Sequence, residues 1–385
     1  MAATINVGGA CTLIGAITAA NNDGFAGGCA AGSGADTIVL APNSTHTLTA
    51  VNNSTYRPNG LPVITSAITI VGNSSTITRD PNAPEFFRIL AVVGNNGNLT
   101  LQETTVSGGR AMGFPGNGGG IANYGTLTLV NSTVVGNRAL GDGGGVFNGF
   151  SDTLTLINST VFSNAAGSRG GGVYNTGFLN LSNSVVSGNS ASFDGGGVFS
   201  RSTLILLNSN ISGNTAVQDG GGLGLVGTAT VEKSTVSGNS ASLGGGLHTS
   251  GTATVINSTV SGNFARRNGG GFNNTRTVTL TNSTVSGNST AENGGGMRNS
   301  STLNLYQTLI SGNMASLQGP ELYHASGIVN ANRFNLFGHD GEAGVTNFSR
   351  CRGHLFPYDG PARNTAPPGR GREPGRIARL RYRSL

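Results

Sequence analysis

A repeat of about 25 residues constrains this chain more than any other feature of its 385 residues. Triple glycines recur at intervals of 24 to 27 residues, and an asparagine recurs with the same period. The triple glycines begin at Gly118, Gly143, Gly170, Gly195, Gly220, Gly244, Gly269 and Gly294. The asparagines are Asn137, Asn164, Asn189, Asn214, Asn239, Asn263, Asn288 and Asn313. Two markers that share one period in this range are typical of a solenoid.

The repeat has the chemistry of β-strands. Each unit holds segments of the types Thr-x-Thr-Leu, Ser-Thr-Val-Ser and Gly-Gly-Val, separated by Asn and Gly. Alternating apolar and polar residues indicate half-buried strands, and Asn and Gly favour turns between them. Stacked coils would bury a continuous column of Leu, Val and Ile, which no segment can bury alone. With 65 glycines and many Thr, Val, Asn and Ser residues, a helical solenoid is excluded. The predicted fold is all-β, a single parallel β-helix.

The chain divides into four predicted parts. Residues 1–35 form an N-terminal cap, because apolar residues at helical spacing (13, 16, 17 and 20) predict a short helix that ends near Asn22. Such a helix would cover the open end of the stack. Residues 36–116 predict irregular β-helix coils with Pro-containing loops, and residues 117–349 predict the regular coils. Residues 350–385 predict a disordered basic tail.

The basic charge of the chain is confined to that tail. The tail carries nine Arg against two acids, which gives it a charge of +7. The whole chain carries +6, so the remaining residues carry −1. The near-neutral body predicts no nucleic-acid partner. We favour an out-of-frame translation for residues 350–385 over a basic interaction tail, because their composition changes abruptly to Arg, Pro and Gly.

Two cysteines flank the predicted cap helix. Cys11 and Cys29 predict a disulfide formed in an oxidising compartment, and the alternative is two unpaired thiols in a cytosolic protein. The local pairing and the exported-looking repeat favour the disulfide. The sequence has no apolar stretch of the ~18 residues that a membrane helix needs, so we expect no transmembrane segment. We also expect no signal peptide in this chain.

The N-terminal cap and the repeats resemble known bacterial proteins. Residues 11–21, 28–29 and 34–40 resemble the cap of exported proteins named for a Cys-Ser-Leu-Arg-Glu-Ala-Ile motif, with Ile14 and Gly15 in place of its Arg-Glu. The repeats are similar to those of the choice-of-anchor Q group and of polymorphic outer-membrane proteins, and residues 337–340 resemble the close of a Q-type β-helix. The resemblance covers residues 4–349. It implies a right-handed parallel β-helix, secreted or at the cell surface, and no defined enzymatic activity.

Aspartates directly precede three of the triple glycines, at Asp142, Asp194 and Asp219. Adjacent coils would place Asp194 and Asp219 ~5 Å apart, and oxygen ligands at that spacing could hold calcium. The alternative is a solvated ladder at a turn, in which Arg169 balances the charge of Asp142 and Asp194. Two carboxylates fall short of the six to eight oxygens that calcium takes. We therefore favour the ladder and predict no metal site.

No other residue pattern predicts chemistry. The acids of the body are scattered, and the five histidines are interpreted as isolated, with His46 and His248 in surface strands or turns. His339 and Asp340 adjoin each other, but they fall at the end of the rod. Residues 222–227 match the dinucleotide fingerprint, but they lie within a strand repeat and lack the strand–turn–helix context. We predict no catalytic residue and no cofactor.

Two repeated polar positions are interpreted as structural. The first is an Asn that recurs at one coil position, directly before a Ser, where stacked side chains would satisfy the turn backbone. Its members are Asn131, Asn158, Asn183, Asn208, Asn257 and Asn282, and several begin an Asn-Ser-Thr glycosylation pattern that we interpret as a coincidence of the repeat. The second is a Thr-x-Thr array opposite the buried Leu or Val. It resembles the ice-binding face of β-helical antifreeze proteins, but exposed strands favour Thr in any case. Its pairs are Thr126/Thr128, Thr153/Thr155, Thr228/Thr230, Thr252/Thr254 and Thr277/Thr279, and it is interrupted at Phe178/Asn180 and Thr203/Ile205.

The sequence favours an exported or cell-surface scaffold without catalysis, for adhesion or for binding of surface polysaccharide. The alternative is a carbohydrate-active β-helix enzyme, a polysaccharide lyase or hydrolase. Ice binding by the Thr-x-Thr face is a third, remote hypothesis. A cluster of carboxylates in a groove would favour the enzyme, since cleavage of a glycan needs acid–base groups or a metal.

Overall fold

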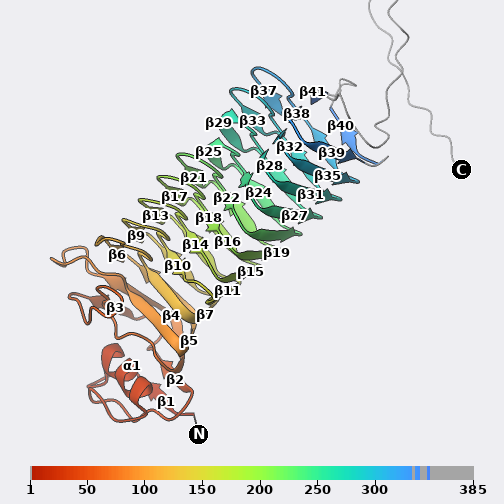
Figure 1. Ribbon diagram of the computed structural model, residues 1–385. Coiled ribbons are helices and arrows are strands. Elements are labelled where there is room, and N and C mark those ends of the chain that lie inside the picture. The colour runs from red at the N-terminus through yellow and green to blue at the C-terminus, as the bar shows by residue number, and fades with distance from the viewer. Residues whose placement is uncertain (1, 332–333, 339–344, 347–385) are drawn as a thin grey trace, which may run out of the picture.

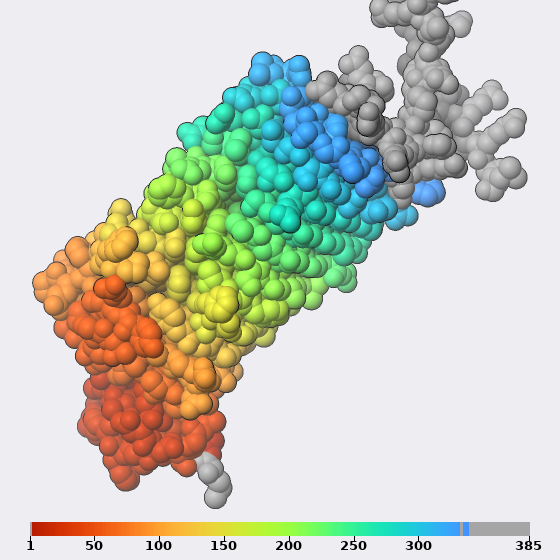
Figure 2. All heavy atoms as spheres, viewed as in Figure 1, coloured from red at the N-terminus to blue at the C-terminus, as the bar shows by residue number. Residues whose placement is uncertain are grey.

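The computed structural model describes residues 2–331, 334–338 and 345–346, and it is an elongated stack of parallel coils (Figure 1). Its strands pair in parallel throughout the stack, which confirms the predicted β-helix. Figure 2 shows the same order as successive bands of colour along one body, from the N-terminal cap to the last coils. The predicted tail at residues 350–385 and the pair His339–Asp340 lie outside the described residues.

Each regular coil contributes one strand to each of four columns, and every strand pairs with its counterparts in the coils before and after. Column 1 holds the Thr-x-Thr-Leu strands. Its members are β1 (Thr4–Asn6), β2 (Asp36–Val39), β4 (Ala67–Arg79), β5 (Leu90–Ser107), β7 (Ile121–Val130), β11 (Thr153–Ile157), β15 (Phe178–Ser182), β19 (Thr203–Leu207), β23 (Thr228–Glu232), β27 (Thr252–Ile256), β31 (Thr277–Thr281), β35 (Thr302–Tyr306) and β39 (Ile328–Ala331).

Column 2 holds the Ser-Thr-Val-Ser strands, after one turn. Besides the ends of β4 and β5, its members are β3 (Thr45–Leu48), β8 (Thr133–Val135), β12 (Thr160–Phe162), β16 (Val185–Ser187), β20 (Asn210–Ser212), β24 (Thr235–Ser237), β28 (Thr259–Ser261), β32 (Thr284–Ser286), β36 (Leu309–Ser311) and β40 (Leu336–Phe337).

Column 3 follows the second turn and is a separate nine-stranded sheet. Its members are β6 (Arg110–Ala111), β9 (Arg138–Ala139), β13 (Ala165–Ala166), β17 (Ser190–Ala191), β21 (Thr215–Ala216), β25 (Ser240–Leu243), β29 (Phe264–Asn268), β33 (Ser289–Thr290) and β37 (Met314–Ala315). The sequence predicted only three strands per coil and missed this one. Most members have two residues, too few to show an alternating pattern.

Column 4 holds the strands that follow the triple glycines. Besides the first residues of β5 and β7, its members are β10 (Val146–Asn148), β14 (Val173–Asn175), β18 (Val198–Ser200), β22 (Leu223–Leu225), β26 (Leu247–Thr249), β30 (Phe272–Asn274), β34 (Met297–Asn299), β38 (Leu322–His324) and β41 (Val345–Thr346). The triple-glycine loop joins column 3 to column 4, so it passes close to the same loop in the next coil. A Cβ on Gly245 would lie 2.3 Å from the carbonyl oxygen of Phe264, which explains the need for glycine.

The core is a thin aliphatic column, as the sequence predicted. In the coil that contains β31, Val278, Leu280, Val285 and Met297 are fully buried. Each packs above its counterpart in the neighbouring coils, since register is kept along every column; Leu280, for example, pairs with Val255 and Leu305. Because equivalent positions stack directly, an apolar residue at the same position of every coil fills the interior continuously.

The two repeated asparagines have different roles. The exposed Asn at the first turn adopts a left-handed conformation, for example at Asn208 with φ 50° and Asn257 with φ 50°. Neighbouring members bond to each other, since the Asn208 side chain donates to that of Asn183 at 2.6 Å, which confirms the predicted stacking for this pair. Asn is the non-glycine residue that tolerates this conformation best, which explains why Asn recurs at this turn.

The other asparagines, which recur with the triple glycines from Asn137 to Asn313, form a ladder inside the coils. The backbone N–H and side-chain Nδ2 of Asn214 both donate to Oδ1 of Asn239, at 2.9 and 3.0 Å, and Nδ2 also donates to the carbonyl oxygen of Val186 at 2.9 Å. Asn189 makes the same pair of bonds to Asn214. These side chains therefore satisfy the buried polar backbone at the turn between columns 2 and 3.

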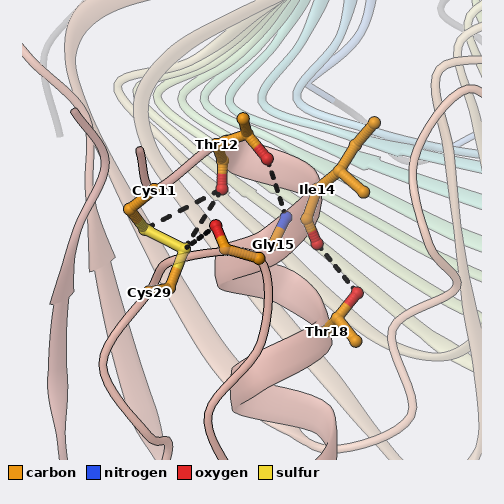
Figure 3. The surroundings of a disulfide bond; sticks show 7 residues. Cys11, Thr12, Ile14, Gly15, Thr18 and Cys29 are labelled. Atoms are coloured by element: carbon orange, nitrogen blue, oxygen red, sulfur yellow. Dashed lines mark hydrogen bonds between the residues drawn. A yellow bond between two sulfur atoms is a disulfide. The ribbon is translucent and has the colours of Figure 1, made fainter. Parts of the chain in front are cut away.

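The N-terminal end carries the predicted capping helix, α1 (Leu13–Asn22), which lies beside β1 and β2 in Figure 1. Its N-cap is Thr12, whose Oγ1 accepts from the Gly15 N–H at 3.1 Å, and its C-cap is Asp23 in a left-handed conformation. Cys11 and Cys29 form the predicted disulfide beside the first turn of the helix (Figure 3). No helix in the described part of the chain is long and apolar enough to span a membrane.

Candidate functional site

One row of outward-facing side chains runs along column 4. It consists of the middle residues of the strands, Phe147, Tyr174, Phe199, Gly224, His248, Asn273, Arg298 and Tyr323, which pair in register. The aromatic members stack on one another, with ring centroids 5.4 Å apart for Phe147 and Tyr174 and 5.6 Å apart for Tyr174 and Phe199. Tyr124 and Tyr56 continue the ring stack toward the N-terminus. The stack ends at Phe199, because the next position is Gly224.

The missing side chain at Gly224 leaves a pocket of about 230 Å³ between Phe199 and His248. It is lined by Arg169, Asp194, Phe199, Arg201, Asp219, Gly224, Leu225, Val226, His248 and Ser250. A Cβ at Gly224 would lie 2.9 Å from Cδ2 of Phe199, so any side chain at this position would displace the ring or fill the pocket. The pocket is smaller than the ~300–1,000 Å³ of sites for drug-sized ligands, and it suits a single ring with polar substituents.

The first charged pair of the pocket is Arg169 with Asp194. Each residue directly precedes a triple glycine, in adjacent coils, and the guanidinium Nε lies 3.0 Å from Oδ2 of Asp194. The Arg169 guanidinium also lies 5.3 Å from the centroid of the Phe199 ring, and its backbone N–H donates to Oδ1 of Asp142 at 3.0 Å. The Arg169 guanidinium therefore balances the charge of Asp194 as predicted, whereas Asp142 accepts only from the Arg169 backbone. The Arg169–Asp194 pair forms one wall of the pocket.

The second pair is Asp219 with His248, whose Nε2 lies 3.8 Å from Oδ2 of Asp219. Nδ1 of His248 is 2.8 Å from the amide nitrogen of Asn273, which donates to it, so Nε2 carries the ring proton. Burial raises the pKa of Asp219, partly offset by His248 and reinforced by Asp194. Burial lowers the pKa of His248, partly offset by the two aspartates. Both pKa shifts favour a neutral His248 imidazole whose Nε2–H points toward Asp219.

The third charged group is Arg201, at the turn between columns 4 and 1. Its guanidinium bonds to the side chain of Tyr174, and Arg201 is otherwise exposed. Ser250 occupies the corresponding turn two coils later, and its hydroxyl donates to the Leu225 carbonyl at 3.4 Å. The pocket thus gathers donors and acceptors from four consecutive coils, each held by a rigid strand or turn.

Two interpretations from the sequence differ from this arrangement. The five histidines were read as isolated, but His248 adjoins Asp219 and has a side chain only 15% exposed. The sequence places Asp194 and Asp219 on adjacent coils, but it predicts a solvated ladder there, and the structure shows a pocket. The sequence could not show the pocket because Phe199 and Gly224, which complete it, come from strands on the far side of the triple-glycine loop.

A signal for the site was nevertheless present in the repeat. The interval from Gly220 to Gly244 is 24 residues, the shortest between successive triple glycines, and this coil carries Gly224 where its neighbours have Phe199 and His248. It also replaces the buried Asn or Ser of column 4 with Leu225. A coil that departs from its own repeat at adjacent positions is a candidate site, since regular stacking needs no such change.

The remaining candidates do not form a second site. The fingerprint-like residues 222–227 are strand β22 and the turn to β23, and three of them line the pocket, but they lack the helix that a dinucleotide site requires. His46 lies in β3 and bonds to Ser44 at 3.0 Å. Within the described residues no group of three or more His, Cys, Asp or Glu side chains is arranged to hold a metal ion.

The Thr-x-Thr array lies in register along column 1. Thr228, Thr252, Thr277 and Thr302 form one uninterrupted row, and the parallel row ends at Asn304. Phe178, Asn180 and Ile205 interrupt both rows in the preceding coils. The array is therefore regular over only a few coils.

Comparison with known proteins gives little direct information. No protein-family model matches the chain, and no curated protein matches it. Among solved structures, it is similar to the crystal structure of the pectate lyase Pel9A, with a TM-score of 0.40 and 15% sequence identity over 76% of this chain and 70% of that one. The functional interpretation therefore depends on the pocket itself.

Proposed function

We propose that this protein is an exported or cell-surface β-helical scaffold that binds glycans through the pocket at Gly224. The observation that supports this most is the single empty place in the row of column 4, with Phe199 on one side and His248 on the other. A rigid solenoid holds that place open without any loop that must order on binding, which lowers the cost of association.

The chemistry of the pocket suits a sugar ring. Hydroxyl groups both donate and accept, and the pocket offers acceptors on Asp194 and Asp219 and donors on Arg169 and Arg201. Phe199 offers an apolar edge, although its residue is only 5% exposed, so polar contacts supply most of the recognition. Because two cations and two carboxylates share the walls, the balance favours a ligand with many hydroxyls over a highly charged one.

The proposed location outside the cell is supported by the disulfide and by the surface. Cys11–Cys29 closes the cap, and disulfides persist in oxidising compartments. Side chains such as those of Thr228, Thr252 and Thr277 present a repeated hydroxyl-bearing surface over column 1. A scaffold of this kind presents the same face over its length, as adhesion to a repetitive polymer requires.

A glycan array probed with the full chain and with Gly224→Val tests the proposal. Valine suits a strand and would fill the pocket, so binding should fall by about tenfold or more, equivalent to ~1.4 kcal/mol. The matched control is Thr230→Val, which places the same side chain outside the pocket on β23, the next strand along the chain, and it should bind as the wild type does. Melting temperatures of the variants confirm that each is folded. Equal glycan binding by wild type and Gly224→Val, or no binding to any glycan, would refute the proposed site.

A further inference from the structure

We propose that the pocket also hydrolyses a glycosidic bond, with Asp219 as the general acid and Asp194 as the nucleophile. This inference rests on the proposed function, because the bond to be cleaved belongs to the glycan that the pocket binds. It goes further by assigning a reaction and two roles. The substrate class is a glycoside whose ring fits the place left by Gly224, with the leaving group directed toward Asp219.

The stack sets the spacing of the two aspartates along the rod. Asp194 and Asp219 each directly precede a triple glycine in consecutive coils, and both line the pocket. Backbone positions that are equivalent in adjacent coils lie ~4.8 Å apart. Glycosidases that retain anomeric configuration place their two carboxyl groups ~5–5.5 Å apart, whereas inverting enzymes need ~6.5–9.5 Å. The backbone spacing of the two aspartates is therefore closer to the retaining arrangement than to the inverting one.

The surroundings of the two carboxylates differ in the way that the two roles require. Asp194 is paired with the Arg169 guanidinium at 3.0 Å, which holds its carboxyl group in a fixed orientation at the wall of the pocket. Within the described residues Asp219 forms an ion pair with His248 and with no arginine, and burial raises its pKa, as a general acid requires. The groups that face Asp219 are His248, Asp194 and Arg267, and His248 and Arg267 act against this rise while Asp194 adds to it.

The proposed reaction has two balanced steps. The Asp194 carboxylate attacks the anomeric carbon, the bond from that carbon to the leaving oxygen breaks, and Asp219 gives its proton to that oxygen. Water then attacks the glycosyl ester, Asp219 takes a proton from the water, and the Asp194 carboxylate is released. No oxidant, reductant or metal enters either step.

His248 is a positioning residue in this scheme. Asn273 holds its Nδ1, and its Nε2–H faces Asp219, so the ring orients the carboxyl group and contributes no base. Replacement of His248 by Gln should alter the pH profile of cleavage more than the affinity for glycan, because Gln retains a donor but removes the titrating ring.

The experiment incubates the full chain with end-labelled oligosaccharides of polygalacturonate, alginate, xylan and β-1,3-glucan, together with any glycan bound on the array. The expected result is cleavage with a hydroxyl at each new end and retention of anomeric configuration in the first product, followed by NMR. Asp219→Asn and Asp194→Asn should each lower kcat by at least ~100-fold while glycan binding persists. Asp142→Asn, at the same coil position outside the pocket, should leave cleavage unchanged.

The results separate this inference from the proposed function. Binding that depends on Gly224 without cleavage of the bound glycan overturns the inference and leaves the binding function standing. Cleavage that survives in both Asp219→Asn and Asp194→Asn, or products that carry a new double bond, overturns the assigned roles and reaction. Absence of any glycan binding or cleavage overturns both.

Discussion

Leu280 shows how a single residue supports the whole stack. Its side chain is fully buried, and it contacts equivalent residues in the coils above and below. Leu280→Ala should lower the free energy of unfolding by ~2–5 kcal/mol, because the thin core cannot close the cavity. Leu280→Asp should cost more, since it buries an unpaired charge. Urea unfolding measures both, with Thr279→Ala as the surface control expected to change stability by less than about 0.5 kcal/mol. Wild-type stability in Leu280→Asp would contradict the stacking.

The inner asparagine ladder should be as sensitive as the apolar core. Asn214→Ala removes the acceptor of two bonds from Asn189 and the donor to the Val186 carbonyl, and all of these groups are buried. Each unsatisfied buried group costs ~1–3 kcal/mol, so the free energy of unfolding should fall by at least ~2 kcal/mol. Asn208→Gly is the control at the exposed turn, where glycine tolerates the left-handed conformation. Equal stability of the two variants in guanidinium unfolding would show that the ladder contributes nothing.

Asp152 gives the fold a pH dependence with a definite sign. Burial raises its pKa from 3.8 to about 6 in the folded state. A carboxyl group with a raised pKa favours folding when protonated, so its contribution is complete below pH 3.8 and is lost as the pH rises to about 6. Asp152→Asn removes this titration. The melting temperature of the wild type, taken relative to that of Asp152→Asn, should fall across this window, and a constant difference would contradict the assignment.

At the scale of elements, the disulfide secures α1 against the first coils. Cys11 and Cys29 are 18 residues apart in sequence, and α1 lies between them. Closing a loop of this size stabilises a fold by ~2–4 kcal/mol. Cys11→Ser combined with Cys29→Ser should therefore expose the cap to limited proteolysis at a lower temperature than the regular coils. Mass spectrometry of unreduced exported protein checks that the bond forms, and two free thiols there would contradict it.

Elements that repeat were predictable, and elements that are short or irregular were not. Columns 1 and 2 follow from alternation in Thr-x-Thr-Leu and Ser-Thr-Val-Ser, and α1 follows from the spacing of its apolar residues. Column 3 has strands such as Ser190–Ala191, whose hydrogen bonds come only from the neighbouring coils. No local pattern marks such a strand, because its stability depends entirely on stacking.

At the scale of the molecule, the repeat predicts which residues stack but not which faces meet across a coil. Asp194 and Asp219 were placed on adjacent coils correctly, since one period separates them. Their contact with Phe199, His248 and the gap at Gly224 depends on how the triple-glycine loop folds back beside column 4. That path is set by close backbone packing between coils, and it has no signature in residue type beyond the glycines themselves.

The most direct test of the account is a crystal structure of the full chain with the best-binding glycan from the array. We expect one sugar ring between Phe199 and His248 over Gly224, with hydroxyl groups ~2.7–3.2 Å from polar atoms of Asp219 or Arg201. A glycan bound only along the threonine rows of column 1, with the pocket free of sugar, would contradict it.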